Sequence, residues 1–285
     1  MSIGHSGHVA RRTLLNWAAS ASTTLAQGFF AALFPSDCRL CNTPLVNISR
    51  LPVCNTCLLA MAPLAGDTCD VCGERLPGIP RPAGREMCSA CQEARPLFSR
   101  ATAYGAYESE LRDLIHLLKY EGVLPAAAVL GKMLAEAIDR LDIGQGPVAL
   151  VTVPLYRAKR RQRGFNQAEL IARAALKASR KSNLRLLTDV LVRQRDTVSQ
   201  IGLTRPQRIE NIRGAFRVLH PTRVAGQRLL LLDDVLTTGT TASECARVLR
   251  KAGAASVFVA TVGRTLKQSN SNLQIQPGFA TAQVS

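Results

Sequence analysis

One stretch near the carboxyl end of the chain, residues 228–253, places the strongest constraint on the fold. Four consecutive leucines, Leu229–Leu232, form an unbroken apolar run, which is typical of a strand buried on both faces of a parallel sheet. Two aspartates end this run, a turn rich in threonine and glycine follows, and apolar residues then recur at helical spacing to about Lys251. The pattern predicts a strand, a ligand-binding turn and a helix, with Gly253 at the end of the helix.

The turn in this stretch has the chemistry of a sugar-phosphate site. Paired carboxylates bind vicinal sugar hydroxyls, and backbone N–H groups at a helix N-terminus bind a phosphate. We therefore expect Asp233 and Asp234 to hold ribose hydroxyls, and to serve the ligand and not the core. The residues expected around the 5-phosphate are Val235, Leu236, Thr237, Thr238, Gly239, Thr240 and Thr241. The alternative is an ordinary turn whose acids only cap the helix; a Walker-type loop is disfavoured because no lysine follows Gly239.

Eight of the nine cysteines form four Cys-x-x-Cys pairs, with 12, 11 and 15 residues between successive pairs. Two such pairs complete a tetrahedral Zn²⁺ site that has no open position. We expect two structural zinc ions in a small module that folds around its own metal-dependent core. The simplest arrangement joins the first two pairs and the last two pairs, and an interleaved arrangement stays open. A secreted disulfide scaffold fits poorly with the nucleotide-handling pattern of the remaining chain. The expected ligands are Cys38, Cys41, Cys54, Cys57, Cys69, Cys72, Cys88 and Cys91.

The chain is strongly basic, with a formal net charge of +16 over 285 residues, and this favours a polyphosphate substrate or nucleic acid as a partner. Ten lysines and arginines but only one carboxylate, Glu169, fall between residues 157 and 185. They follow an apolar run at 148–153, and ligand crevices in open α/β sheets lie at the carboxyl ends of strands. The alternative is a solvated basic face. The substrate-binding residues expected here, with three cations facing a pyrophosphate, are Lys119, Pro154, Leu155, Arg161 and Arg163.

Three further motifs narrow the interpretation: Arg163-Gly-Phe-Asn-Gln-Ala, Thr197-x-x-Gln and Asn211-x-x-Gly-Ala-Phe. With the cysteine pairs and the acid-threonine turn, they resemble the ComF family of competence and DNA-utilisation proteins over roughly residues 30 to 265. The turn itself is similar to the phosphoribosyl-pyrophosphate loop of type I phosphoribosyltransferases. One departure is Tyr156, where the family pattern usually has histidine after Pro-Leu.

The resemblance implies an α/β fold: a type I phosphoribosyltransferase-like parallel sheet flanked by helices and preceded by a double zinc ribbon. It implies binding of phosphoribosyl pyrophosphate with Mg²⁺, with Asp233 and Asp234 as catalytic residues of a pentosyl transfer. It also implies a link to DNA uptake or to the use of external DNA, with single-stranded DNA and uptake proteins such as a helicase as partners. The alternative is a non-catalytic nucleic-acid-binding or adaptor protein. A cytoplasmic location is expected.

The chain divides into four expected segments: an extension at 1–34, the zinc ribbons at 35–95, the phosphoribosyltransferase-like domain at 96–265 and a disordered tail at 266–285. Arg11-Arg12 superficially resembles a twin-arginine signal, but polar residues interrupt the apolar ones that follow. We therefore expect an amphipathic helix and no transmembrane segment, with the helix packed on the protein body or touching a membrane surface. The other expected elements are strands at 101–106 and 257–262, and helices ending near residues 119 and 141.

Overall fold

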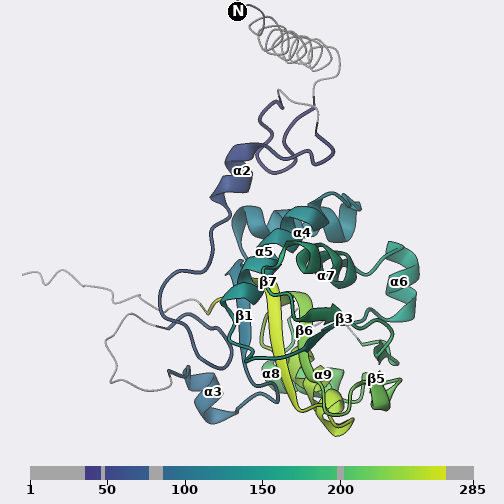
Figure 1. Cartoon of the computed structure of the whole chain (residues 1–285). Coiled ribbons are helices and arrows are strands. Elements are labelled where there is room, and N and C mark those ends of the chain that lie inside the picture. Colours follow the sequence, from purple (N-terminus) through teal and green to yellow (C-terminus); the bar gives the residue numbers. More distant parts are fainter. Residues whose placement is uncertain (1–35, 46–48, 77–85, 198–201, 268–285) are drawn as a thin grey trace, which may run out of the picture.

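The computed structural model describes residues 36–45, 49–76, 86–197 and 202–267. The expected N-terminal helix lies outside these ranges, and so does the expected C-terminal tail from residue 268 onward. The centre is a five-stranded sheet in which every neighbouring pair of strands is parallel (Figure 1), which confirms the expected fold class. The order across the sheet is β1 (Ala101–Ala106), β7 (Ser256–Arg264), β6 (Arg228–Leu236), β2 (Val148–Thr152) and β3 (Leu184–Leu186).

The leucine run forms the middle of the sheet, as its composition predicts. Leu230 of β6 lies beside Leu150 of β2 on one side and Phe258 of β7 on the other. The four leucines Leu229–Leu232 are at most 1% exposed, so apolar side chains are needed on both faces of the strand. The strand is longer than expected, because its pairing with β7 continues to Leu236. The two aspartates are therefore part of the strand and do not follow it.

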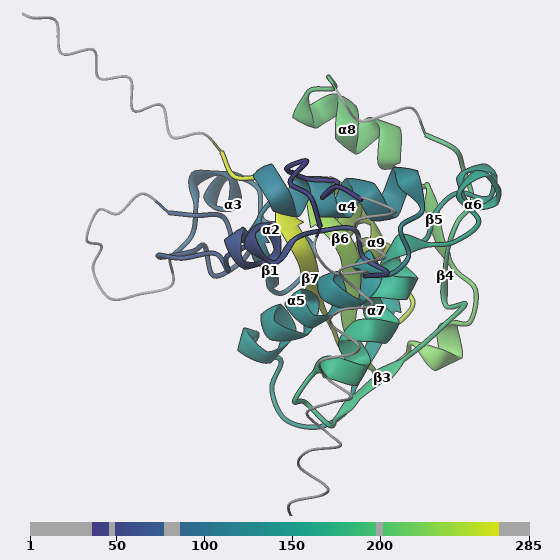
Figure 2. The same ribbon diagram turned by 90° about the horizontal axis from the view of Figure 1, so that it is seen from above.

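Helices cover both faces of the sheet. On one face lie α4 (Ser109–Glu121), α5 (Ala126–Arg140) and α7 (Gln167–Ala178), and on the other lie α9 (Thr240–Lys251) and α8 (Arg205–Ile212) (Figures 1 and 2). Gly122 ends α4 in the left-handed conformation, with φ of 67°, which a residue without Cβ adopts at little cost. Among the described residues, no helix has both the length and the apolar character needed to cross a membrane.

Two short strands, a 3-10 turn and a short helix lie outside the five-stranded sheet. Strands β4 (Leu191–Arg193) and β5 (Phe216–Val218) form an antiparallel pair, and a 3-10 turn, η1 (Pro221–Arg223), follows them. The basic segment after β2 forms a short helix, α6 (Arg157–Arg163), which the sequence analysis missed. None of its residues is buried, so the helix has no apolar periodicity that the sequence could reveal.

The zinc-ribbon segments carry the short helices α2 (Asn55–Ala60) and α3 (Ser89–Glu93). Cys57 and Met61 of the first ribbon belong to the same apolar cluster as the helices on the α4 face. Cys69 and Val71 of the second ribbon belong to the cluster on the α9 face. The expectation of a separate core for the ribbons is therefore wrong: each ribbon extends one of the two cores of the main domain.

Candidate active site

The two aspartates of β6 are adjacent in sequence but serve different neighbours, because successive side chains of a strand point to opposite faces. Asp234 forms an ion pair with Lys119 of α4, with Nζ 2.8 Å from Oδ2. Both side chains are largely buried, at 6% exposure for Asp234 and 14% for Lys119. Burial disfavours the charged form of Lys119, but the carboxylate of Asp234 outweighs it and raises the pKa of the lysine. Asp234 therefore has a role in the core, contrary to the expectation that it serves only a ligand.

Asp233 lies in surroundings that favour its protonated form. Burial and the neighbouring charge of Asp234 raise the pKa of Asp233 to about 8, while Lys119 acts in the opposite direction. The Oδ1 atom of Asp233 accepts the backbone N–H of Asp234 at 2.9 Å, which holds the carboxyl group at the strand end. A ligand that supplies a cation or hydroxyl donors here would stabilise the charged form of Asp233.

An aromatic group borders the lysine, and the sequence analysis did not identify it. The hydroxyl of Tyr107, which directly follows β1, is 2.8 Å from Nε2 of His116 on α4. Burial and the nearby charges of Lys119 and Arg112 lower the pKa of His116. Its neutral imidazole can then accept a hydrogen bond from the tyrosine hydroxyl. His116 also contacts Tyr120 edge-on, with ring centroids 5.2 Å apart. These side chains form a fixed wall beside Lys119.

The threonine turn connects β6 to α9 as the sequence predicts. Gly239 has a φ of 76° directly before the helix, a conformation that favours glycine. The hydroxyls of Thr238 and Thr240 are 2.9 Å apart, and Thr237 and Thr238 are exposed. Leu236, which the sequence analysis placed around the phosphate, instead buries its side chain in the core, and its carbonyl accepts the N–H of Thr265 at 3.0 Å. It anchors the loop, and the threonines form its open surface.

The two arginines expected to bind pyrophosphate have different surroundings in the structure. The guanidinium carbon of Arg163 lies 5.5 Å from the ring centre of Tyr120, and the side chain donates to the Oε1 atom of Gln167. Arg163 is thus held next to the helix that carries Lys119. Arg161 is exposed on α6 and forms no ion pair with a described residue. Pro154 and Leu155, at the end of β2, are partly buried.

Arg193 of β4 is a candidate site residue that the sequence analysis did not select. It lies beside Tyr156, with which it forms a parallel bridge, and its guanidinium carbon is 5.6 Å from the centre of the Phe216 ring. Its Nε is buried and has no hydrogen-bond partner among the described residues. Burial lowers the pKa of Arg193, and Asp233 is one of the groups that oppose this. A buried, incompletely bonded guanidinium suits an anionic ligand. The only signal in the sequence was its place just before the Thr197 motif.

The eight paired cysteines form two groups, each with its sulfur atoms within 4.8 Å of one another. The groups are Cys38, Cys41, Cys54, Cys57 and Cys69, Cys72, Cys88, Cys91, so consecutive pairs combine. Sulfur atoms around a tetrahedral zinc should be about 3.8 Å apart, because Zn–S bonds are about 2.3 Å long. The observed distances of 3.9 Å between Cys38 and Cys57, 3.7 Å between Cys41 and Cys54, and 3.6 Å between Cys72 and Cys88 fit this geometry. Each group therefore fits one structural zinc ion.

A buried arginine connects the second cysteine group to the sheet. Nη2 of Arg264, the last residue of β7, is 2.9 Å from Oε2 of Glu74 and 3.3 Å from Sγ of Cys72. Arg264 is also the strand partner of Leu236, which directly precedes the threonine loop. The second ribbon is thus attached to the strand that supports the loop.

Comparisons with known proteins agree with this architecture. The double zinc ribbon domain model matches residues 29–92, and the phosphoribosyl transferase domain model matches residues 124–270. A solved glutamine phosphoribosylpyrophosphate amidotransferase from B. subtilis shares 22% identity and covers 48% of this chain and 26% of its own, with a TM-score of 0.31.

Three relatives carry names that concern DNA utilization or competence. DNA utilization protein YhgH of Escherichia coli (strain K12) is 32% identical over 235 residues, which cover 81% of this chain and 98% of the relative. Competence protein F of Haemophilus influenzae is 29% identical and covers 61% of this chain and 76% of its own. Competence protein ComFC of Bacillus subtilis is 24% identical and covers 75% and 84%. With its double zinc ribbon and phosphoribosyl transferase domain, the chain belongs to the ComF family of DNA-utilization and competence proteins.

Proposed function

We propose that the protein binds phosphoribosyl pyrophosphate with Mg²⁺ at the carboxyl edge of the sheet and transfers its phosphoribosyl group. The observation that carries the proposal is the direct succession of Asp233, Asp234 and the threonine loop at the end of β6. Carboxylates are suitable ligands for Mg²⁺ and for ribose hydroxyls, and the open threonine turn before α9 suits the 5-phosphate. Membership of the phosphoribosyl transferase domain family supports the same assignment.

In this proposal the acidic side chains bind the ribose, and the basic side chains bind the pyrophosphate. Asp233 and Asp234 hold the ribose hydroxyls directly or through Mg²⁺, which when bound supplies positive charge to the pyrophosphate. Lys119 orients Asp234 through their 2.8 Å ion pair. The bond from C1 of the ribose to pyrophosphate breaks with its electron pair on the departing oxygen, and a nitrogen of the acceptor forms the new bond to C1. Cationic side chains stabilise the departing charge, and the candidates are Arg161, Arg163 and Arg193.

We further propose that this activity serves DNA use in the cytoplasm, with single-stranded DNA and uptake proteins such as a helicase as partners. The names of the relatives motivate this, and α6 adds a physical reason. Arg157, Lys159, Arg160 and Arg161 are exposed on this helix, and Glu169, 3.9 Å from Arg160, forms the one ion pair found for them among the described residues. An exposed basic helix suits a phosphate backbone. DNA binding without turnover is therefore the second candidate function.

We also propose the division into segments at 35–95 and 96–265 as the functional one, with the ribbons supporting the transferase-like domain. The structure favours support over independence, because each ribbon is continuous with one core of the main domain. The extension at 1–34 and the tail at 266–285 stay predictions from the sequence.

Calorimetric titration of the zinc-loaded protein with phosphoribosyl pyrophosphate, with and without Mg²⁺, tests the ligand assignment. We expect saturable, Mg²⁺-dependent binding that is lost when Asp233→Asn and Asp234→Asn are combined. Asp142→Asn is the matched control, since its side chain is 80% exposed and lies away from the loop. Equal binding by the double variant and the control would refute the assignment. Pyrophosphate release on addition of candidate bases then separates transfer from binding alone.

Salt-dependent DNA binding distinguishes the second candidate. If α6 contacts a phosphate backbone, Arg160→Gln and Arg161→Gln should each weaken single-strand binding modestly and reduce the salt slope by about one contact. Arg163→Gln should instead weaken phosphoribosyl pyrophosphate binding by roughly tenfold or more, since it removes a charge-assisted hydrogen-bond donor. Equal small losses at all three positions with intact ligand binding would favour a surface that contacts only DNA.

A further inference from the structure

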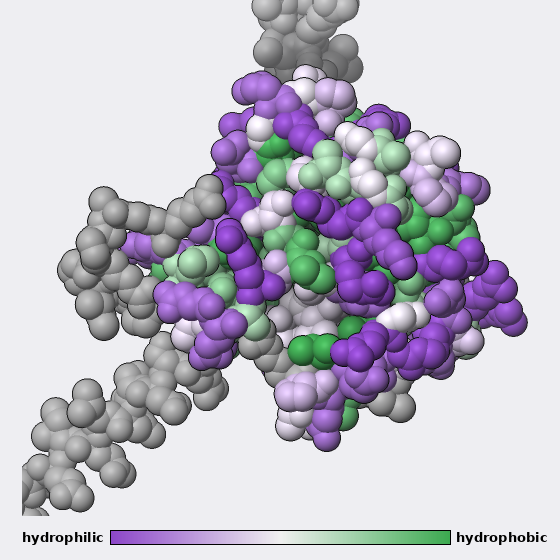
Figure 3. All heavy atoms as spheres, turned by 90° about the horizontal axis from the view of Figure 1, so that it is seen from below, coloured by the Kyte–Doolittle hydropathy of each residue, from purple (hydrophilic) through white to green (hydrophobic). Residues whose placement is uncertain are grey.

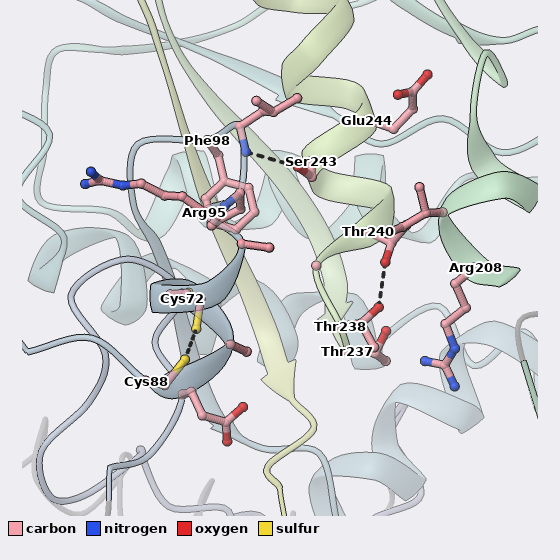
Figure 4. Close-up of a pocket in the computed structure, with 18 of the residues that line it drawn as sticks. Cys72, Cys88, Arg95, Phe98, Arg208, Thr237, Thr238, Thr240, Ser243 and Glu244 are labelled. Carbon is pink, nitrogen blue, oxygen red and sulfur yellow. Dashed lines mark hydrogen bonds between the residues drawn. The ribbon is translucent and has the colours of Figure 1, made fainter. Parts of the chain in front are cut away.

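A cavity of about 540 Å³ lies against the threonine loop, on the side that faces the second zinc ribbon (Figure 4). Its volume is within the range of small-molecule sites, roughly 300–1,000 Å³. The loop, α8, the first turns of α9, the end of β7 and the segment after α3 all contribute to its lining. The cavity is thus built from both the second ribbon and the transferase-like domain.

The cavity begins where the proposed ribose phosphate site ends. Residues Thr237–Thr240 form one of its walls, whereas Asp233, Asp234 and Lys119 do not line it. A phosphate held by the loop would therefore have the aspartates on one side and this cavity on the other. A terminal phosphate, as in phosphoribosyl pyrophosphate, leaves such a space unused.

Exposed apolar side chains line the cavity from two different segments of the chain. Leu97 and Ile209 are 52% and 43% exposed, and they are two of the few large apolar side chains with high exposure in the described part of the chain. Both line the cavity, Leu97 from the segment after α3 and Ile209 from α8. Leu97 is held in place, because its backbone N–H donates to Oγ of Ser243 on α9 at 3.0 Å. Figure 3 shows this underside of the molecule, where hydrophobic side chains lie among strongly hydrophilic ones. Apolar walls in a concave site suit a flat, weakly polar group.

The cavity also carries unneutralised positive charge. Three of its arginines have carboxylate partners: Arg264 with Glu74, Arg247 with Glu244 and Arg213 with Glu210. Arg95 and Arg208 line the cavity and form no ion pair with a described residue. Arg208 donates its Nε to the carbonyl of Leu203 at 2.8 Å, and within the part of the chain that the structure describes its two terminal nitrogens form no ion pair. Apolar walls together with free guanidinium groups favour a nucleotide.

We propose that the cavity binds a second nucleoside that is joined to the ribose through its 5-phosphate. The inference rests on the proposed placement of the ribose phosphate at the threonine loop. The second base would lie between Leu97 and Ile209, and Arg95 and Arg208 would face the linking phosphates. A ligand of this chemistry comes from two sources: the 3′ end of a nucleic acid strand, or a free dinucleotide that ends in ribose.

Three probes separate these possibilities by isothermal calorimetry on the zinc-loaded full chain. Ribose 5-phosphate fills only the loop and the aspartates. The dinucleoside monophosphate ApA represents a strand end, and ADP-ribose represents a free dinucleotide. We expect at least one of the two larger probes to bind about tenfold or more tightly than ribose 5-phosphate. Tighter binding of ApA alone assigns the site to a strand end, and tighter binding of ADP-ribose alone assigns it to a dinucleotide.

Variants of the two apolar side chains test whether the tighter binding of a larger probe arises in the cavity. Leu97→Asp and Ile209→Asp should each weaken the tighter larger probe about tenfold, which is the order expected for loss of a partly buried apolar contact, and leave ribose 5-phosphate within twofold. Leu124→Asp is the matched control, because Leu124 is 51% exposed and does not line the cavity. All three side chains are exposed, so the fold should tolerate each change, and far-UV circular dichroism verifies this.

The outcomes distinguish this inference from the proposed function. If ribose 5-phosphate binds and neither larger probe binds more tightly, the cavity inference is wrong and the phosphate site stands. If a larger probe binds more tightly but the wall variants behave like the control, the second nucleoside lies elsewhere and the inference is again wrong. If ribose 5-phosphate, phosphoribosyl pyrophosphate and the larger probes all fail to bind, the proposed function itself fails.

Discussion

The ion pair between Lys119 and Asp234 gives the sharpest test of the site, because it connects α4 to β6, the strand that carries both aspartates. At 2.8 Å, the attraction between unit charges is about 6 kcal/mol at an effective dielectric constant of about 20, before the cost of desolvation. Removing one partner of a buried pair leaves the other charge uncompensated and typically costs about 3–5 kcal/mol. We expect Lys119→Met to lower the free energy of unfolding by about 3 kcal/mol, since its side chain keeps 14% exposure.

Replacing Asp234, the other partner, should lower the free energy of unfolding by less. Asp234→Asn leaves Lys119 without a counter-charge, but it also removes the repulsion that helps to raise the pKa of Asp233. We expect a loss of about 2 kcal/mol, and we expect the double variant to be about as stable as Asp234→Asn alone. The coupling energy from this cycle should then be about 3 kcal/mol at pH 7. Urea unfolding of zinc-saturated protein, followed by far-UV circular dichroism, measures all four free energies.

An exposed pair in the same chain provides the matched control. Glu210 and Arg213 on and after α8 are 3.6 Å apart, with side-chain exposures of 74% and 70%. Their cycle, with glutamine at each position, should give a coupling of less than about 0.5 kcal/mol. If the Lys119 and Asp234 changes were also additive to within about 0.5 kcal/mol, the ion pair would not hold the site together and the reasoning would be refuted.

Three further outcomes are expected. Native mass spectrometry should show two zinc ions per chain and one in either Cys41→Ser or Cys88→Ser, whereas loss of both ions from one variant would contradict separate sites. The pKa of Asp233 rises from 3.8 to about 8 in the folded protein, so between about pH 4 and 8 the folded protein holds a proton that the unfolded chain releases. The free energy of unfolding should therefore fall as the pH rises through this range. Urea unfolding of Asp233→Asn should show a weaker fall with pH than the unchanged protein, and an equal fall would show that Asp233 is not its source. Arg264→Gln leaves Glu74 buried without its 2.9 Å cationic partner and should lower the free energy of unfolding by about 2–4 kcal/mol; a loss below about 0.5 kcal/mol would show that this pair does not support the second ribbon.

The sequence by itself determined the features that depend on neighbouring residues. The leucine run Leu229–Leu232 predicts a strand buried on both faces, because such a strand needs apolar side chains at every position. The Cys-x-x-Cys spacing predicts zinc, because two intervening residues place both sulfurs at one ion. The order of acids, threonines and helix likewise indicates a sugar-phosphate site, since its parts are consecutive in the chain. The exposed helix α6 was missed because it lacks an apolar face.

Only the tertiary structure decided which distant residues meet. It joined consecutive cysteine pairs, which the spacing left open, and it paired Asp234 with Lys119, which had been assigned to pyrophosphate. It also brought Arg264 to Cys72, 192 residues away in the chain. These contacts depend on the order and register of strands β1, β7 and β6 and on the packing of α4 across them. Local patterns contain no information about such packing, because the same strand and helix signals are compatible with many arrangements of the elements around a sheet.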